Sequence, residues 1–152
     1  MCCNGVIFAD VRLRRAEDPS ALEAAGIEFV GRRLPQPCPA LDGCACKVYA
    51  IRPRHCRAFD CQVLLRVKAA ELSHAEGLRL VRRAQRSVQK IEGILARLGD
   101  SNVRQPLAAR FRIMAARMEQ CPPLGAKARD FARLTAAMHE LNVQLSRDFY
   151  PG

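Results

Sequence analysis

The chain has 152 residues, 49% hydrophobic and 26% charged, a composition typical of one folded domain and not of a disordered chain. The formal net charge is +10, with a balance of +2 on residues 1–61 and +8 on residues 62–152. No apolar run approaches the ~20 residues of a membrane span. The first residues do not resemble a signal peptide, because the basic residues follow the short apolar run. We therefore expect a cytoplasmic protein without a membrane segment.

The positive charge raises the question of a nucleic-acid or acidic protein partner. Only four of the 25 basic residues are lysine, which is typical of an arginine-favouring codon bias. Aromatic residues make up 5% of the chain, with no Trp, so few side chains are suited to stacking on nucleic-acid bases. Nucleic acid is not expected as a partner, and a partner protein is not identified.

Residues 1–61 predict mostly irregular structure. A turn at 2–5 precedes extended segments within 6–13. The sequence DPS within 18–26 predicts a brief helix that stops at its glycine, followed by a short extended piece. Four prolines disfavour regular structure across most of 31–61, where a short strand is expected at 46–49.

Residues 62–152 predict helices. The sequence SHAE at 73–76 is a capping box ahead of an amphipathic run that ends at Gly99. A second helix begins near Pro106 and breaks at 121–123, and a third spans about 126–148. The side chains expected to face inward are Leu78, Val81, Val88, Ile91, Leu95, Leu98, Leu107, Phe111, Met114, Met118, Phe131, Leu134, Met138, Leu141 and Leu145.

The expected fold is therefore a single, mainly α domain over residues 1–152. Residues 1–61 form a loop-rich cysteine-cluster part with short β segments. Residues 62–152 form a bundle of about three helices, on which we expect the cysteine-cluster part to pack.

Seven of the eight cysteines occur within the first 61 residues. In a cytosolic protein such clustered thiols indicate metal binding more than disulfides. A thiolate binds zinc or iron at about 2.3 Å, and four thiolates close a tetrahedral site. Residue types alone do not distinguish a zinc site from an iron site or an iron–sulfur cluster. The predicted metal ligands are Cys2, Cys3, Cys38, Cys46, Cys56 and Cys61.

The remaining cysteines and the nearby polar residues are less clear candidates. Cys44 is an optional ligand, because it is one residue from Cys46, and Cys121 is expected to be an inert, buried thiol. Arg52 and Arg57 are candidate cofactor-binding residues, which either balance the charge of a thiolate site or bind an anionic ligand. Ordinary solvated arginines are an equally good interpretation. The three histidines are interpreted as structural.

The sequence CKVYAIRPRHCRAFDC at 46–61 resembles the core C-x-[IV]-Y-x-x-R-P-x-x-C-R-x-F-x-C of the YkgJ-type cysteine-cluster family. Cys38 resembles the cysteine that precedes this core, and Cys2-Cys3 resembles the final pair of the family's N-terminal CxxCxxCC motif. The resemblance covers about the first sixty residues and implies chelation of zinc or iron.

The two leading cysteines of CxxCxxCC have no counterpart here. Either the ligand set is reduced, or the start codon lies further upstream, and we expect the second. Flagellin lysine N-methylase has a cysteine motif similar to that of this family. A metal- or cluster-dependent protein-modifying enzyme is therefore the alternative to a metal-chelating protein of unassigned role.

Overall fold

The computed structural model describes residues 1–150 and is mainly α, as predicted, with 55% of the described residues helical. The contacts within the chain define two compact units. The first unit consists of Met1–Phe59 together with Asn102–Ala109. The second consists of Asp60–Ser101 and the described residues from Arg110 onward.

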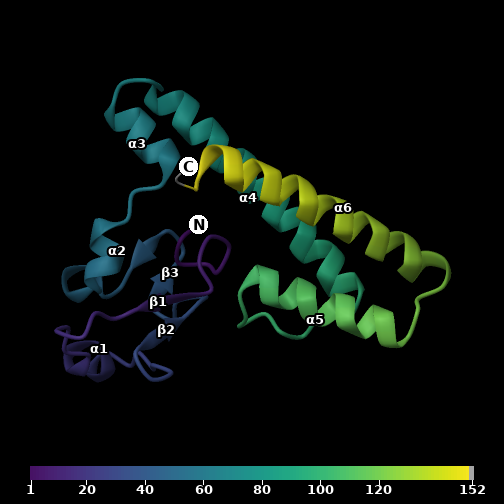
Figure 1. The fold of residues 1–152 in the computed structure, drawn as a ribbon, viewed down its shortest axis with the longest axis horizontal. Helices are drawn as coiled ribbons and strands as arrows, with labels where there is room; N and C mark the ends of the chain where they lie inside the picture. Colours follow the sequence, from purple (N-terminus) through teal and green to yellow (C-terminus); the bar gives the residue numbers. More distant parts are fainter. Residues whose placement is uncertain (151–152) are drawn as a thin grey trace. The chain divides into compact units, whose positions relative to one another are not determined.

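Short strands and short helices make up the first unit (Figure 1). Two antiparallel pairs of strands are present, one joining β1 to β2 and the other joining β3 to β4. In the first pair Val11 lies opposite Leu34, and both side chains are buried. The elements are β1 (Asp10–Arg12), α1 (Ser20–Ala24), β2 (Arg33–Pro35), β3 (Leu41–Asp42), β4 (Ala45–Cys46), the 3₁₀ helix η1 (Tyr49–Ile51) and α2 (Arg54–Ala58).

The local signals of this unit are confirmed in part. The backbone N–H of Ser20 donates to Asp18 at the start of α1, and Gly26 follows the helix at φ +78°, as its predicted stop requires. The strand expected at 46–49 is wrong beyond Cys46, because the backbone leaves the extended region at Val48 (φ −106°, ψ 30°) and turns into η1. In place of the extended segment expected at 6–8, the chain has a bend at Val6 and Ile7.

A small apolar core holds the first unit together. Its buried side chains come from β1, α1, β2 and the loops between them, and three cysteines pack against it while remaining partly exposed. The core residues are Val11, Leu13, Leu22, Ile27, Leu34 and Ala40, and the cysteines are Cys38, Cys46 and Cys56.

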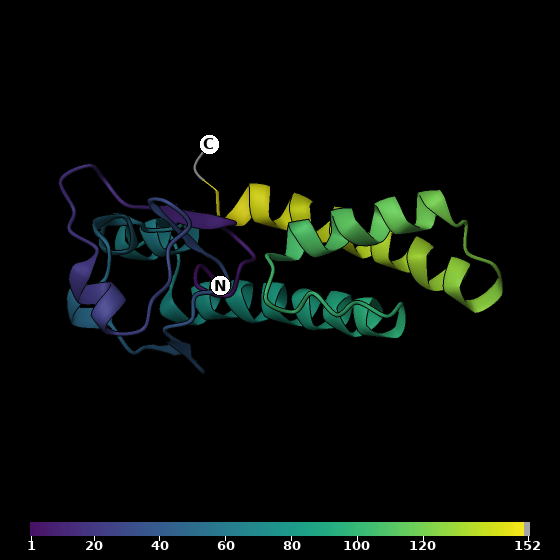
Figure 2. The ribbon, with the colours of Figure 1, turned by 90° about the horizontal axis from the view of Figure 1, so that it is seen from below.

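Long helices make up the second unit. Within it, α4 and α6 run antiparallel along one another (Figure 1 and Figure 2), and α3 packs against α4. The predicted capping box is confirmed: the Ser73 N–H donates to the Glu76 carboxylate at 2.8 Å, and the Glu76 N–H donates to the Ser73 hydroxyl at 3.2 Å. The helices are α3 (Gln62–Lys68), α4 (His74–Arg97), α5 (Leu107–Gln120), whose first three residues belong to the first unit, and α6 (Gly125–Asp148).

Most side chains expected to face inward do so, but Leu78 is 53% exposed. Its neighbour Gly77 is buried instead, close to Val63 and Val67 of α3. A side chain at Gly77 would meet Val67 at 2.8 Å, so the first turn of α4 approaches α3 through its glycine and turns Leu78 outward. None of the helices within residues 1–150 combines the length and the apolar character that crossing a membrane requires.

Candidate metal centre

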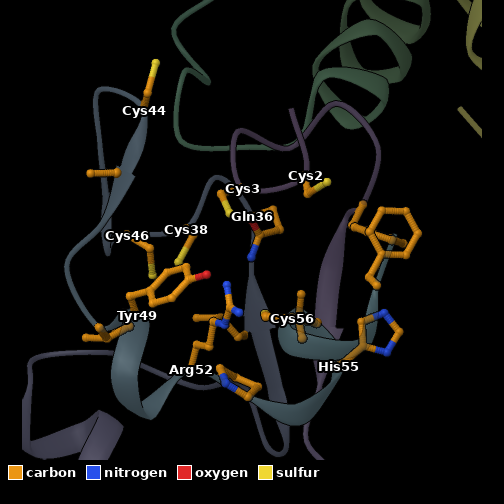
Figure 3. Close-up of a pocket in the computed structure, with 17 residues that line it drawn as sticks. Cys2, Cys3, Gln36, Cys38, Cys44, Cys46, Tyr49, Arg52, His55 and Cys56 are labelled. Carbon is orange, nitrogen blue, oxygen red and sulfur yellow. The ribbon is translucent and has the colours of Figure 1, made fainter. Parts of the chain in front are cut away.

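A cavity of about 510 Å³ in the first unit collects six of the eight cysteines (Figure 3). The lining has no aspartate or glutamate, and its one formally charged side chain is that of Arg52. Apolar and aromatic side chains form most of the remaining wall. The polar and sulfur-bearing lining residues are Cys2, Cys3, Gln36, Cys38, Cys44, Cys46, Tyr49, Arg52, His55 and Cys56.

Backbone hydrogen bonds bring cysteines from distant parts of the sequence together. The N–H of Cys38 donates to the carbonyl of Cys3 at 2.7 Å, which joins the N-terminal loop to the segment after β2. The carbonyl of Cys38 accepts from Leu41, the first residue of β3, and Leu41 lies opposite Cys46 in the hairpin. Cys3, Cys38 and Cys46 are therefore held near one another by the main chain.

Helix α2 supplies Cys56 and a cluster of rings. Phe8 makes edge-to-face contacts with Phe59, at 4.7 Å between ring centroids, and with His55, at 5.6 Å. These contacts tie the N-terminal loop to α2. His55 is exposed and also lines the cavity, so its interpretation as a structural residue stays a prediction.

The N-terminal loop is also fixed by a segment about one hundred residues away. The N–H of Leu107 donates to the carbonyl of Gly5 at 3.0 Å. Gly5 has φ +76°, and a Cβ there would lie 3.0 Å from the Cα of Pro106. Glycine therefore satisfies both the left-handed backbone and the close approach of 102–109 to the loop that carries Cys2 and Cys3.

The six thiols are not equivalent. The side chains of Cys3, Cys38 and Cys46 point toward a common space, whereas Cys2 diverges from Cys3, as expected for neighbouring residues (Figure 3). Cys44 lies at the tip of the β3–β4 hairpin, is exposed and points away from the others. Cys3, Cys38, Cys46 and Cys56 are therefore the strongest candidates for a common ligand set.

Burial sets the protonation of two of these thiols. Burial, with smaller contributions from the neighbouring Cys3, Cys38 and Cys46, raises the pKa of Cys56 to about 11, although the charge of Arg52 acts in the opposite direction. Burial also raises the pKa of Cys38, with contributions from Cys3 and Cys46. At neutral pH these two groups are thiols, which are poor nucleophiles.

Two buried polar atoms on this cavity have no hydrogen-bond partner. They are Oε1 of Gln36, whose residue is 2% exposed, and Nε of Arg52. Within residues 1–150 no other buried side-chain nitrogen or oxygen is left in this state. Because an unpaired buried polar group is costly, both atoms indicate that the cavity is built around an occupant.

The donor set fits a thiophilic metal in its chemistry, since sulfur dominates the lining and carboxylates are missing from it. The positions of the donors do not yet form a complete site. Across the described part of the chain, no group of three or more His, Cys, Asp or Glu side chains is already arranged to hold a metal ion. The thiols would therefore have to converge further to hold a metal, which loops and short strands would allow.

The predicted site residues differ in their position relative to the cavity. Cys2, Cys3, Cys38, Cys46, Cys56 and Arg52 line the cavity, together with the optional Cys44. Cys61 does not line it and stands at the N-cap of α3 in the second unit, so its role as a ligand stays a prediction.

The last two candidates lie outside the cavity. Arg57 is exposed, and its Nε donates to the carbonyl of Arg52 at 2.9 Å. Cys121 was expected to be buried, and this is wrong: it is exposed, because the helix α5 ends before it and a double proline follows.

The sequence did not point to Gln36, Tyr49, Phe8 or Phe59 as lining residues. A weak signal exists for Tyr49, since it precedes Arg52 by three residues and the guanidinium carbon of Arg52 lies 3.7 Å from the centroid of its ring. No comparable pattern marks Gln36, whose position depends on the pairing of β1 with β2.

Comparison of the chain with protein-family models, with curated proteins and with solved structures finds no match.

Proposed function

We propose that the first unit holds a thiolate metal centre. The centre binds zinc or iron, and the iron can be part of an iron–sulfur cluster. We also propose that the protein is cytoplasmic. The observation that carries the proposal is the gathering of six thiols, without a carboxylate, on one cavity. Cys3, Cys38, Cys46 and Cys56 form the central ligand set, with Cys2 as the fifth candidate. A bound metal supplies the positive charge that turns buried thiols of raised pKa into thiolates.

The modest core of the first unit supports the same proposal. Six buried apolar side chains and strands of two or three residues give this unit little stability of its own. Small units of this kind commonly gain stability from a metal, because metal-binding free energy becomes folding free energy. The resemblance of residues 38–61 to the YkgJ-type family agrees with this chemistry, and we propose membership of that family.

The enzymatic alternative is a metal- or cluster-dependent protein-modifying activity. A free cysteine nucleophile finds no support at Cys38 or Cys56, because burial keeps both protonated at neutral pH. Such an enzyme would have to work through the metal itself. An iron-loaded anaerobic sample whose centre is saturated and redox-silent would remove this alternative.

The proposal is tested by purifying the full chain without added metal and measuring bound zinc and iron together with an absorption spectrum. We expect about one equivalent or more of one metal, since four thiolates complete a tetrahedral site. The double variant Cys38→Ser/Cys46→Ser is expected to lose it, whereas Cys121→Ser, which removes an exposed thiol of the second unit, keeps it. A Cys61→Ser variant decides whether that residue is also a ligand.

Folded wild-type protein with less than about a tenth of an equivalent of either metal, and no uptake from added zinc or ferrous iron, contradicts the proposal, because complete thiolate sites bind such metals tightly. Equal metal loss in the Cys121→Ser variant contradicts the assignment of the site.

A further inference from the structure

Arg52 occupies an unusual position for an arginine. It follows η1 and precedes Pro53, and its side chain lies against the Tyr49 ring with the guanidinium carbon 3.7 Å from the ring centroid. Figure 3 shows the guanidinium pointing into the space bordered by the thiols. The stacking on Tyr49 fixes the plane of the guanidinium, so its N–H groups have a defined direction.

The charge of Arg52 has no carboxylate beside it on the cavity, and its Nε has no hydrogen-bond partner. In the second unit, by contrast, a buried arginine has carboxylate partners. Arg110 is 6% exposed, and it donates to Asp100 at 2.7 Å and to Glu92 at 3.3 Å. Arg52 is half-buried, but its Nε is buried and unpaired, and an occupant of the cavity would be placed to supply the acceptor that this atom lacks.

We propose that Arg52 is the counter-ion and hydrogen-bond donor of the thiolate centre, which rests on the proposed function. When the cysteines bind a metal as thiolates, the Nε–H of Arg52 donates to a ligating sulfur, with Cys56 as the first candidate. Four thiolates on a divalent ion carry a net charge of −2, and the guanidinium halves it. Arg52 is thus a positioning and charge-balancing residue, and it is not a ligand.

The neighbouring arginines offer a matched control. Arg54 is exposed, lies two residues further along the chain and does not line the cavity. The change Arg54→Gln removes the same charge from the same stretch of sequence. It therefore separates the specific role of Arg52 from a general loss of positive charge.

The test loads the apo full chain anaerobically with Co²⁺ and measures both its affinity and the energy of the sulfur-to-cobalt charge-transfer band. For Arg52→Gln we expect a loss of affinity of roughly 10- to 100-fold, as for other residues that support metal ligands. We also expect the band to move to lower energy, because a sulfur that loses an N–H donor holds its electrons less tightly. Arg54→Gln is expected to match the wild type in both measurements.

A second variant separates charge from hydrogen bonding. Arg52→Lys keeps the positive charge but lacks the planar donor, so its band is expected to shift like that of Arg52→Gln while its affinity falls less. If Arg52→Gln does not fold, the band of Arg52→Lys decides the question.

An unchanged band in the folded variants, or an equal loss of affinity in Arg54→Gln, overturns this inference while leaving the metal centre intact. Failure of the wild type itself to bind Co²⁺ is a different result, because it overturns the proposed function.

Discussion

The second unit is built on long helices whose buried side chains repeat along α4 and α6, whereas the apolar core cluster of the first unit has six buried residues and its strands are no longer than three residues. Their polar groups differ in the same way. In the second unit Arg110 meets two carboxylates, but in the first unit Gln36 and Arg52 each keep a buried atom unpaired. The second unit satisfies its buried arginine with its own carboxylates, whereas the first unit leaves two buried polar atoms without a partner from the protein.

The largest expected effect is the response to metal removal. When a chelator strips the metal-loaded full chain, we expect amide hydrogen exchange in β1 and β2 to accelerate at least about 100-fold, since structural zinc contributes roughly 10–16 kcal/mol in small peptides. Amides in the middle of α4 and α6 should keep their protection, because their core does not depend on the site. Mass spectrometry with peptide resolution measures both regions in one sample.

Equal loss of protection in both units would contradict the proposed difference between them, because it would show that the helices also depend on the metal. Unchanged exchange in β1 and β2 would show that the first unit is stable by itself.

A mutation that creates a cavity in the helical core is expected to have the opposite pattern: it should destabilise the second unit and leave the metal site unaffected. Leu134 is fully buried in α6, and Leu134→Ala is expected to lower the free energy of unfolding of the second unit by about 2–5 kcal/mol. Leu78→Ala removes a half-exposed side chain of α4 and should change the free energy of unfolding by no more than about 0.5 kcal/mol. Urea unfolding followed by circular dichroism measures both variants, and metal content should stay at the wild-type level. Loss of metal in Leu134→Ala would contradict the independence of the two units.

A smaller and more local effect is expected at Gly5. Gly5→Ala forces an alanine into the left-handed region, which costs about 1–2 kcal/mol, and places a Cβ 3.0 Å from the Pro106 backbone. Gly31→Ala has the same backbone penalty, at φ +62°, with no atom near its Cβ. Metal affinity should therefore fall more in Gly5→Ala than in Gly31→Ala. Equal affinities would show that the contact with Pro106 does not hold the cysteine loop.

The helices were largely predictable because their signals are local. The Ser73–Glu76 capping box and the helical spacing of apolar residues fixed α4, and the same spacing identified most of the buried face of α6. Leu78 was misplaced because the buried stripe of α4 continues through Gly77, and a glycine gives no hydrophobic signal. The helix α2 was not foreseen, although it begins directly after Pro53, where proline is tolerated.

The site was predictable by residue type but not by position. The clustering of cysteines pointed to Cys3, Cys38, Cys46 and Cys56, and all four line the cavity. The sequence ranked Cys46 above the optional Cys44, but it did not show that Cys44 points away, because the direction of each side chain depends on the hairpin formed by β3 and β4. It also did not separate Arg52 from Arg57, since stacking on Tyr49 is what directs Arg52 inward.

The bond from Leu107 to Gly5 has a consequence for the order of events during biosynthesis. The loop that carries Cys2 and Cys3 is synthesised about one hundred residues before the segment that holds its backbone in place. At synthesis rates of about 5–20 residues per second, Pro106 follows Cys3 by roughly 5–20 s. During that interval Cys2 and Cys3 lack the contact that shapes their loop, so the loop reaches its final conformation only after all of α4 has been translated.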